Sequence, residues 1–328
     1  NTGSQPMVSG SSRVISYNGE IYNHEILKNK LLNLGYKFKG SSDTEVILSL
    51  FDEFGSASFG MLKGMFSFVI LDTNNEQLFV VRDTVGIKPV YIYQENNNIY
   101  GCSEIKGLKE FNSVNTEVDP NDIYEFFNNG FLYEPSTGYK DIKKLMPGHY
   151  LQFNLITGKH ETHFFKNIKE FQDDNCLSDK IKNAIQSQQI ADVPLGIFFS
   201  GGADSSILAS HFNSKELFFA KYAADPVADI DLKYSKLIAD YLGKDLNVVE
   251  LDSNVQDIDS LLESVDFVAA NTEELISDYT FWATYQLSLA AKNNGYKVML
   301  SGMGGDEAFA GYPRYIVLKN HNIIKLMS

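Results

Sequence analysis

The sequence predicts an α+β first half built on antiparallel sheet and an α/β second half built on a parallel sheet. Up to about residue 165, short strand-like runs follow one another with few helices between them, which is typical of antiparallel sheet. Beyond that point, apolar strand-like runs alternate with helical periodicity, which is typical of a parallel sheet covered by helices. The chain has 328 residues, enough for two domains, and we place them at 1–165 and 166–328.

Composition and net charge indicate a globular protein with a large core and argue against some kinds of partner. Apolar residues make up 44% of the chain, so a large core can form. The formal net charge of −14 argues against nucleic acid or an anionic membrane as the main partner. Two cysteines, Cys102 and Cys176, suit a reducing, cytoplasmic location better than a disulfide framework. The sequence has no run of about 18 apolar residues that would predict a membrane span.

The first half opens with a strand and two helices. Residues 14–17 have the composition of a strand and lead into Asn18-Gly19, a dipeptide typical of turns. Helical periodicity covers 24–34, and a second helix begins at Ser42-Asp43-Thr44-Glu45, which has the pattern of a capping box. Further strands are then predicted at 65–71, 77–82, 90–94, 99–103, 149–153 and 160–165.

The second half alternates strands with helices. Strands are predicted at 195–199, 217–222, 246–251 and 297–300. Helices are predicted at 178–188, 205–212, 231–242 and 279–293. In an open parallel sheet of this kind, ligands bind beyond the carboxyl ends of the strands.

The loop after the strand at 195–199 is the most informative motif, Ser200-Gly201-Gly202-Ala203-Asp204-Ser205-Ser206. Adjacent glycines let backbone N–H groups converge on an anion, and the helix N-terminus behind them adds partial positive charge. An acidic side chain within such a loop implies a cation, and Mg²⁺ bound to nucleotide phosphates meets that condition. The motif predicts a Mg–ATP site, and the alternative is an ordinary loop.

A second loop of this type follows the strand at 297–300, with the sequence Ser301-Gly302-Met303-Gly304-Gly305-Asp306-Glu307. Two such strand-end loops would place Asp204 and Asp306 near one phosphate site, where both carboxylates can bind one Mg²⁺. The alternative is that Asp306 and Glu307 begin a helix and favour only its dipole. In the first half, Asn18-Gly19-Glu20-Ile21-Tyr22-Asn23 indicates, from local physics alone, a turn followed by a helix N-cap.

Several motifs occur together in one order along the chain. They are Asn18–Asn23, Ser42–Glu45, Gly64-Met65-Phe66, Arg82–Pro89, Ser103–Lys106, Asp192-Val193-Pro194, the Ser200 loop, the Ser301 loop and Gly311-Tyr312. In these motifs the chain resembles the glutamine-dependent asparagine synthetase family. The resemblance covers essentially the whole chain.

The resemblance implies a class II glutamine amidotransferase domain of the N-terminal-nucleophile type, with sandwiched antiparallel sheets. A synthetase domain of the ATP-pyrophosphatase type (adenine nucleotide alpha hydrolase-like) is implied after it. Asn18 and the N–H of Gly19 resemble the family's oxyanion hole. The family's glutamine-binding residues are matched by Asn18, Gly19, Glu20 and Asp43. Asp204 and Asp306 match Mg²⁺ ligands. The positions that match the ATP site are Phe199, Ser200, Gly201, Gly202, Asp204, Ser205, Ser206, Lys221, Ser301 and Gly302.

The implied reaction is that of a carbon–nitrogen ligase with glutamine as nitrogen donor. Glutamine is hydrolysed in the first domain, and ATP activates a carboxylate as an acyl-adenylate in the second. Ammonia then displaces AMP and leaves an amide. The implied partners are glutamine, ATP and Mg²⁺, with aspartate as the expected acceptor, giving asparagine. A homodimer is compatible with the sequence, whereas nucleic acid is not expected.

The sequence departs from the family at its ends. The family's nucleophile is a cysteine at the mature N-terminus, whereas this sequence begins at Asn1. Cys102 and Cys176 are expected to be packed or incidental thiols. We therefore expect truncation at both ends and no glutamine hydrolysis by the chain as written.

Met303 is a further departure, because the family usually has glutamate at this position. A thioether cannot replace a carboxylate in charge or in proton transfer. This residue favours the alternative of an amidotransferase acting on another carboxylate, such as a sugar uronic acid in polysaccharide synthesis. Two further alternatives are a catalytically inactive relative that keeps the fold and an ATP-pyrophosphatase that uses free ammonia or modifies a tRNA base.

Overall fold

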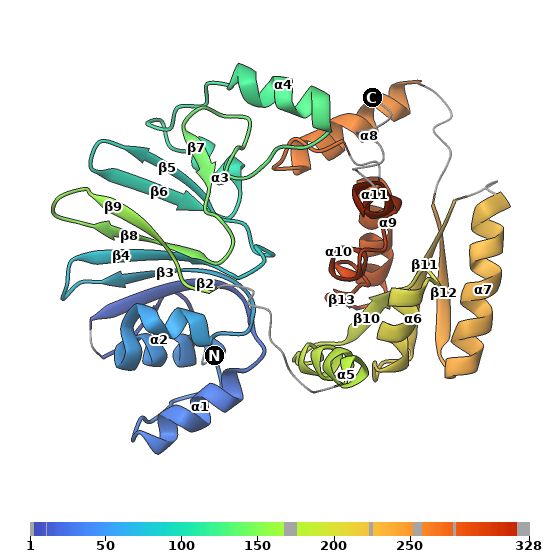
Figure 1. Ribbon diagram of the computed structural model, residues 1–328, viewed down its shortest axis with the longest axis horizontal. Coiled ribbons are helices and arrows are strands. Elements are labelled where there is room, and N and C mark those ends of the chain that lie inside the picture. Colours follow the sequence, from blue (N-terminus) through green and yellow to red (C-terminus); the bar gives the residue numbers. More distant parts are fainter. Residues whose placement is uncertain are drawn as a thin grey trace. The chain divides into compact units, whose positions relative to one another are not determined.

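The chain forms two compact units, each described here by itself (Figure 1). The computed structural model describes residues 3–10, 12–166, 176–222, 226–251, 258–277 and 280–319. Unit 1 comprises Asn1–Asp173 and Ala269–Asp278, and unit 2 comprises Asp174–Val268 and Tyr279–Ser328. A short piece of the second half therefore belongs to unit 1. The division into domains at residue 165 stays a prediction.

Unit 1 contains two antiparallel sheets. The larger sheet has the strand order β1-β2-β3-β4-β8-β9, and the smaller has the order β6-β5-β7. The strands of the larger sheet are β1 (Met7–Val8), β2 (Arg13–Ile21), β3 (Gly64–Asp72), β4 (Gln77–Arg82), β8 (His149–Asn154) and β9 (His160–Phe164). Those of the smaller sheet are β5 (Tyr91–Glu95), β6 (Asn98–Cys102) and β7 (Ile142–Lys144).

The helices of the first half are α1 (His24–Asn33), α2 (Asp43–Phe54), the 3-10 helix η1 (Gly55–Met61), α3 (Ile105–Lys109) and α4 (Pro120–Asn129). All of them except α4 contribute to the hydrophobic clusters on the two sheets. Helices α1 and α2 pack on the face of the larger sheet that carries Phe79 and Val81. Val80, on the opposite face of the same strand, packs against the smaller sheet, and Leu108 of α3 packs on the far side of that sheet. This layering confirms the predicted α+β antiparallel sandwich.

Unit 2 is built on a parallel sheet with the strand order β12-β11-β10-β13. Its strands are β10 (Leu195–Phe198), β11 (Glu216–Tyr222), β12 (Asp245–Leu251) and β13 (Val298–Leu300). The helices of the second half are α5 (Leu177–Ser187), α6 (Ala203–Ser210), α7 (Pro226–Leu242), α8 (Ile258–Asn271), α9 (Thr280–Asn293), α10 (Gly305–Phe309) and α11 (Pro313–Lys319). The predicted α/β parallel sheet is therefore confirmed.

The strand order of unit 2 reverses at β10. The next two strands in the chain, β11 and β12, extend the sheet on one side of β10, whereas β13 pairs on its other side. Open α/β sheets bind ligands at such a reversal, beyond the carboxyl ends of the strands on its two sides, which here are β10 and β13. The loops that follow β10 and β13 are the two glycine-rich loops of the sequence.

Two local predictions in the first half are wrong. Asn18-Gly19 is not a turn, because β2 continues to Ile21 and pairs with β3 along its whole length. The glycine instead allows close approach of the two strands.

The predicted capping box of α2 is only half correct. Ser42 does cap α2 by accepting the N–H of Thr44. Glu45 does not complete a capping box, because its carboxylate accepts the backbone N–H groups of Lys39 and Gly40.

Two predicted properties of the chain can be compared with the structure. Among the described residues, no helix combines the length and the apolar character needed to cross a lipid bilayer. Both cysteines are free thiols: Cys102 lies in β6, and Cys176 is exposed.

Candidate active sites

The first candidate site lies at the end of β2, which carries Asn18, Gly19 and Glu20. Gly19 has a φ of +151°, and a β carbon there would lie 2.1 Å from the carbonyl oxygen of Met65 in β3. A β carbon on Gly64 would likewise lie 2.0 Å from the carbonyl oxygen of Glu20. These two positions therefore require glycine, because β2 and β3 approach too closely there for any side chain.

The backbone of β2 presents N–H groups on the side away from β3. The N–H of Tyr17 donates to the side-chain oxygen of Gln5 at 2.6 Å, and that of Ile21 donates to the Asp43 carboxylate at 3.2 Å. Because backbone groups alternate sides along an antiparallel strand, the N–H of Gly19 faces the same side. This direction suits its predicted role as a donor to an oxyanion.

Asp43, the first residue of α2, is held beside this strand. The Tyr17 hydroxyl donates to Asp43 Oδ2 at 2.7 Å, and the N–H of Ile21 donates to the same oxygen. Burial, and after it the Asp43 carboxylate, raises the pKa of Tyr17, so this phenol stays a donor at neutral pH. The structure thus places Asp43 next to the strand that carries Asn18 and Glu20. Sequence reasoning missed Tyr17, because only the β2–α2 contact reveals its partner.

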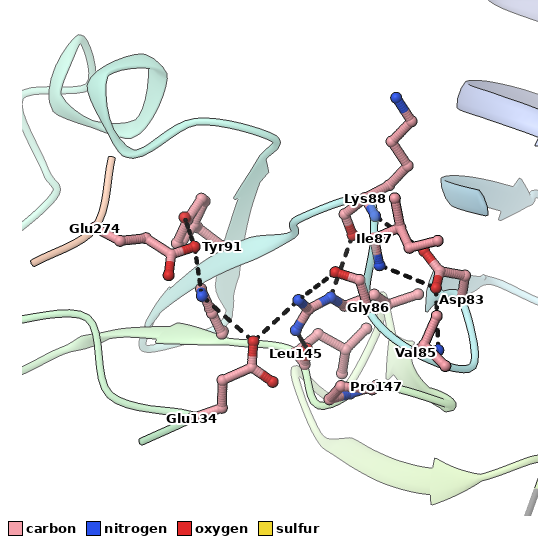
Figure 2. Close-up of polar contacts among 12 residues, drawn as sticks. Asp83, Val85, Gly86, Ile87, Lys88, Tyr91, Glu134, Leu145, Pro147 and Glu274 are labelled. Atoms are coloured by element: carbon pink, nitrogen blue, oxygen red, sulfur yellow. Dashed lines mark hydrogen bonds and ion pairs between the residues drawn. The ribbon is translucent and has the colours of Figure 1, made fainter. Parts of the chain in front are cut away.

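The motif Arg82–Pro89 forms a tight loop that supports strand β3. Asp83 is fully buried, and its carboxylate accepts backbone N–H groups at 3.1, 3.0 and 2.9 Å from Val85, Ile87 and Lys88 (Figure 2). Asp83 also accepts the N–H of Phe66 at 3.2 Å and donates its own N–H to the Phe66 carbonyl at 2.8 Å. Phe66 pairs with Gly19, so this loop fixes the strand beside the predicted oxyanion donor.

An ion-pair network leads from this loop to the segment 269–278. Arg82 Nη2 lies 3.0 Å from Glu134 Oε1, and the Lys144 ammonium lies 3.3 Å from the same oxygen. Lys144 also lies 2.5 Å from Glu274, to which the Tyr91 hydroxyl donates at 3.1 Å (Figure 2). Burial, followed by the Glu274 carboxylate, raises the pKa of Tyr91. Glu274, from the second half of the sequence, therefore completes a polar cluster of unit 1.

The second candidate site begins where β10 ends. Gly201 has a left-handed φ of +74°, and Gly202 is the N-cap of α6. The Ser200 hydroxyl accepts the N–H of Gly202 at 3.3 Å and lies 3.1 Å from Ser205 Oγ. Ser205 Oγ donates in turn to the carbonyl of Gly202 at 3.2 Å. These contacts form a tight turn that opens directly onto a helix N-terminus, a geometry suited to anions.

The loop after β13 lies against the first turn of α6. β10 and β13 are neighbours, with Ile197 opposite Leu300, so their loops leave the same edge of the sheet. A β carbon on Gly302 would lie 3.1 Å from Asp204 Cβ, and one on Gly305 would lie 2.5 Å from Asp204 Cγ. The Asp204 carboxylate therefore lies where the two glycine-rich loops meet.

Four further residues that are predicted to bind the nucleotide or its Mg²⁺ each have a different local environment. Phe199 is buried in the core of unit 2. The Lys221 ammonium lies 2.9 Å from the Asp229 carboxylate, and this hydrogen bond raises the pKa of Lys221. Asp306 extends over Gly311, where a β carbon would lie 1.9 Å from Asp306 Oδ1. Ser206 lies in the first turn of α6, and its buried Oγ has no partner among the described residues.

The donors that could hold Mg²⁺ are Asp204 and Asp306. The described residues contain no group of three or more His, Cys, Asp or Glu that could hold a metal ion. Mg²⁺ at nucleotide sites is usually held by one or two carboxylates together with phosphate oxygens. The residues present therefore fit an ion that arrives on a nucleotide. Asp306 and Glu307 also lie in the first turn of α10, as the helix-dipole alternative requires.

Two family models match the chain. One, described as a glutamine amidotransferase domain, matches residues 1–166. The other, described as asparagine synthase, matches residues 177–325. The two matches fall on the halves of the chain that carry the first and second candidate sites.

Curated relatives match across nearly the whole chain. Asparagine synthetase [glutamine-hydrolyzing] 1 of Bacillus subtilis is 31% identical over 92% of this chain and 48% of its own length. Putative asparagine synthetase [glutamine-hydrolyzing] 2 of Methanocaldococcus jannaschii is 31% identical over 92% of this chain and 59% of its own length. Asparagine synthetase [glutamine-hydrolyzing] 2 of Oryza sativa is 33% identical over 95% of this chain and 50% of its own length. The chain thus spans about half the length of the curated relatives it matches.

Proposed function

This chain belongs to the glutamine-dependent asparagine synthetase family, and on that premise we propose that it takes part in ATP-dependent amidation of a carboxylate. In the proposed reaction, the substrate carboxylate attacks the α-phosphorus of ATP, and the bond from that phosphorus to the bridging oxygen of pyrophosphate breaks. Ammonia released from glutamine then attacks the acyl carbon. AMP leaves with the former carboxylate oxygen, and the nitrogen loses a proton as the amide forms.

The observation that carries this proposal is the meeting of two strand-end loops at the reversal of the parallel sheet. The turn at Gly201 and Gly202 offers backbone N–H groups to an anion, and Asp204 lies against Gly305 of the second loop. This arrangement suits the pyrophosphate part of ATP. Binding that part would expose the α-phosphorus to an acceptor held beyond the loops.

We propose that Asp204 and Asp306 hold Mg²⁺ that arrives on the nucleotide. When bound, this ion neutralises charge on the departing pyrophosphate. The chain's own part is to hold the phosphates on the loop N–H groups and to keep Asp204 close to both loops. Phe199, Ser200, Ser205, Ser206, Lys221, Ser301 and Gly302 complete the proposed nucleotide site.

In unit 1, we propose a site for glutamine at the end of β2. Asn18 and the N–H of Gly19 would donate to the oxyanion formed at the side-chain amide. Glu20 and Asp43 would hold the amino-acid end of glutamine through charge-assisted hydrogen bonds. Removal of a single oxyanion donor typically costs about 3–4 kcal/mol of transition-state stabilisation. We further propose that the protein acts in the cytoplasm, because both of its cysteines are free thiols.

Aspartate is the acceptor we propose first, because the similar relatives are named asparagine synthetases. One observation favours a second candidate, a non-aspartate carboxylate such as a sugar uronic acid. Met303 lies in the loop after β13 and is 84% exposed. A neutral thioether at this position offers no charge to the ammonium group of aspartate, whereas a uronic acid carries no ammonium group.

ATP–pyrophosphate exchange tests the adenylation half of the proposal. The chain is incubated with Mg²⁺, ATP and labelled pyrophosphate, with aspartate in one series and glucuronic and galacturonic acids in another. Exchange that depends on aspartate supports asparagine formation. Exchange that depends on a uronic acid alone supports the second candidate, and the absence of carboxylate-dependent exchange in both series contradicts both.

A further inference from the structure

Ser235 of α7 is a buried polar residue outside every motif of the sequence. Its exposed fraction is 0%, and its Oγ has no hydrogen-bond partner among the described residues. A buried hydroxyl without a partner is rare in native proteins, because it has lost its hydrogen bonds to water without replacing them. This hydroxyl therefore needs an explanation. One explanation is that it gains a hydrogen-bond partner in another state of the protein.

Ser235 lies directly against the turn that follows β10. A β carbon on Gly201 would lie 2.4 Å from Ser235 Oγ and 3.2 Å from the backbone nitrogen and Cα of Ser235. Helix α7 therefore packs against Gly201 itself, and the hydroxyl faces the turn at close range. The left-handed φ of Gly201 and the lack of space together explain why this position holds glycine.

We infer that Ser235 is a positioning residue for the phosphate loop, and that its hydroxyl donates to a peptide carbonyl of the Ser200–Gly202 turn when pyrophosphate is bound there. This inference rests on the proposed function of the second candidate site. The N–H and C=O of one peptide unit point in opposite directions. Because the N–H of Gly202 already donates to Ser200 Oγ at 3.3 Å, the peptide concerned is Ser200–Gly201, and holding its carbonyl on the α7 side directs the N–H of Gly201 toward the ligand.

The remaining contacts of the turn agree with this assignment. The carbonyl of Gly202 already accepts Ser205 Oγ and the N–H of Ser206, so the front of α6 is fixed from within the helix. Gly201 stands before this fixed part, at the residue that Ser235 touches. A second contact from outside the helix, on α7, would fix the part of the turn that the helix does not hold.

A direct contact between Ser235 and the phosphates is the less favoured arrangement. The residue is fully covered, so a ligand could reach Oγ only if the turn moved aside. A purely structural role is also less favoured, because a hydroxyl without a partner adds no stability to the ligand-free fold.

The test compares Ser235→Ala with the unmodified chain in two measurements. Thermal unfolding without ligand reports on the fold, and calorimetric titration with Mg–ATP, Mg–pyrophosphate and AMP reports on the site. Ser210→Ala serves as the matched control, because Ser210 lies at the far end of α6 and its hydroxyl already donates to the Ile207 carbonyl at 2.8 Å.

We expect Ser235→Ala to leave the melting temperature unchanged or higher and to weaken Mg–ATP and Mg–pyrophosphate binding by about three- to tenfold. AMP, which lacks the pyrophosphate part, should bind as before, and Ser210→Ala should bind all three probes like the unmodified chain. Unchanged pyrophosphate affinity, an equal loss for AMP, or a lower melting temperature in Ser235→Ala would overturn the inference. If the unmodified chain binds neither Mg–ATP nor Mg–pyrophosphate, the proposed function fails, and the role of Ser235 fails with it.

Discussion

The Asp204 carboxylate lies against the backbone of Gly305, so that a β carbon on this glycine would come within 2.5 Å of both Cγ and Oδ2 of Asp204. The two residues are far apart in the sequence and belong to loops that follow neighbouring parallel strands. This contact brings the Ser200 loop, whose geometry suits phosphate binding, together with the Ser301 loop. In the sequence, these two loops could be linked only because both follow a strand and have similar residue patterns.

Gly305→Ala is expected to displace the Asp204 carboxylate and to weaken nucleotide binding. Loss of one charge-assisted contact of the Asp204 carboxylate to the bound ligand typically costs about 1.5–3 kcal/mol, which corresponds to roughly 10- to 150-fold in the dissociation constant of Mg–ATP. Isothermal titration measures this constant. Gly10→Ala is the control, because a β carbon on Gly10 would meet nothing within 4 Å. Equal affinity in the two variants would contradict the assigned role of the contact.

Asp43→Asn is expected to weaken glutamine binding without unfolding unit 1. One side-chain oxygen remains to accept the Tyr17 hydroxyl and the N–H of Ile21, which both bind the same oxygen in the unmodified chain. The lost charge should cost about 1.5–3 kcal/mol of binding free energy, or roughly 10- to 150-fold in affinity. Calorimetry with glutamine measures the loss. The exposed residue Glu110 provides the control Glu110→Gln, and the prediction fails if both variants bind glutamine alike.

Glu274→Gln is expected to loosen the segment 269–278 from the rest of unit 1. Lys144 would lose one of its two carboxylate partners but keep Glu134 at 3.3 Å. We therefore expect a loss of about 1–3 kcal/mol in the free energy of unfolding, below the 3–5 kcal/mol typical of a fully unpaired buried charge. Hydrogen exchange of the described backbone in 269–277 and urea unfolding measure the effect. Exchange as slow as in Glu263→Gln, a change at an exposed position of α8, would refute the prediction.

Asp72 should make unit 1 sensitive to acid. Burial alone would raise the pKa of Asp72, but hydrogen bonds from Asn75 and Arg13 bring it below its ordinary value. Its stabilising effect is therefore complete above the unfolded-state pKa of about 3.9 and is lost as the pH falls through the lower folded-state value. Asp72→Asn should be less stable at pH 7 by about 1.5–3 kcal/mol.

The same variant should also lose less stability between pH 5 and pH 2, a range chosen to span roughly the unfolded-state pKa of aspartate. Urea unfolding at a series of pH values measures this dependence. If the free energy of unfolding changed with pH in the same way in Asp72→Asn and in the unmodified chain, another carboxyl group would be responsible for the loss of stability in acid.

The regular parts of the fold could be predicted from residue patterns. The strand–turn–helix at Gly201 and Gly202 is as predicted, because glycine pairs after an apolar run have few other structures available. Asn18-Gly19 misled the prediction, since the same dipeptide can form a turn or allow two strands to approach closely. Helix α4 was missed although Asp119 caps it, Pro120 begins it and Gly130 ends it in a left-handed conformation.

The side-chain partners of the site residues could not be predicted, because they depend on tertiary contacts. No local pattern connects Tyr17 with Asp43, or Ser235 with Gly201. Each pair meets only after a helix has packed on a strand or on the loop that follows it. The site residues that the family resemblance implies stay predictions until the binding measurements above are made.

The segment Ala269–Asp278 has a consequence for how the protein is made. The N–H of Ser277 donates to the Gly130 carbonyl at 2.8 Å, and Glu274 reaches Lys144 and Tyr91. A ribosome produces the chain from its N-terminus at about 5–20 residues per second. When all the strands of unit 1 have left the ribosome, the segment Ala269–Asp278 has not yet been made. Unit 1 can therefore finish folding only after most of the parallel sheet of unit 2 has been translated.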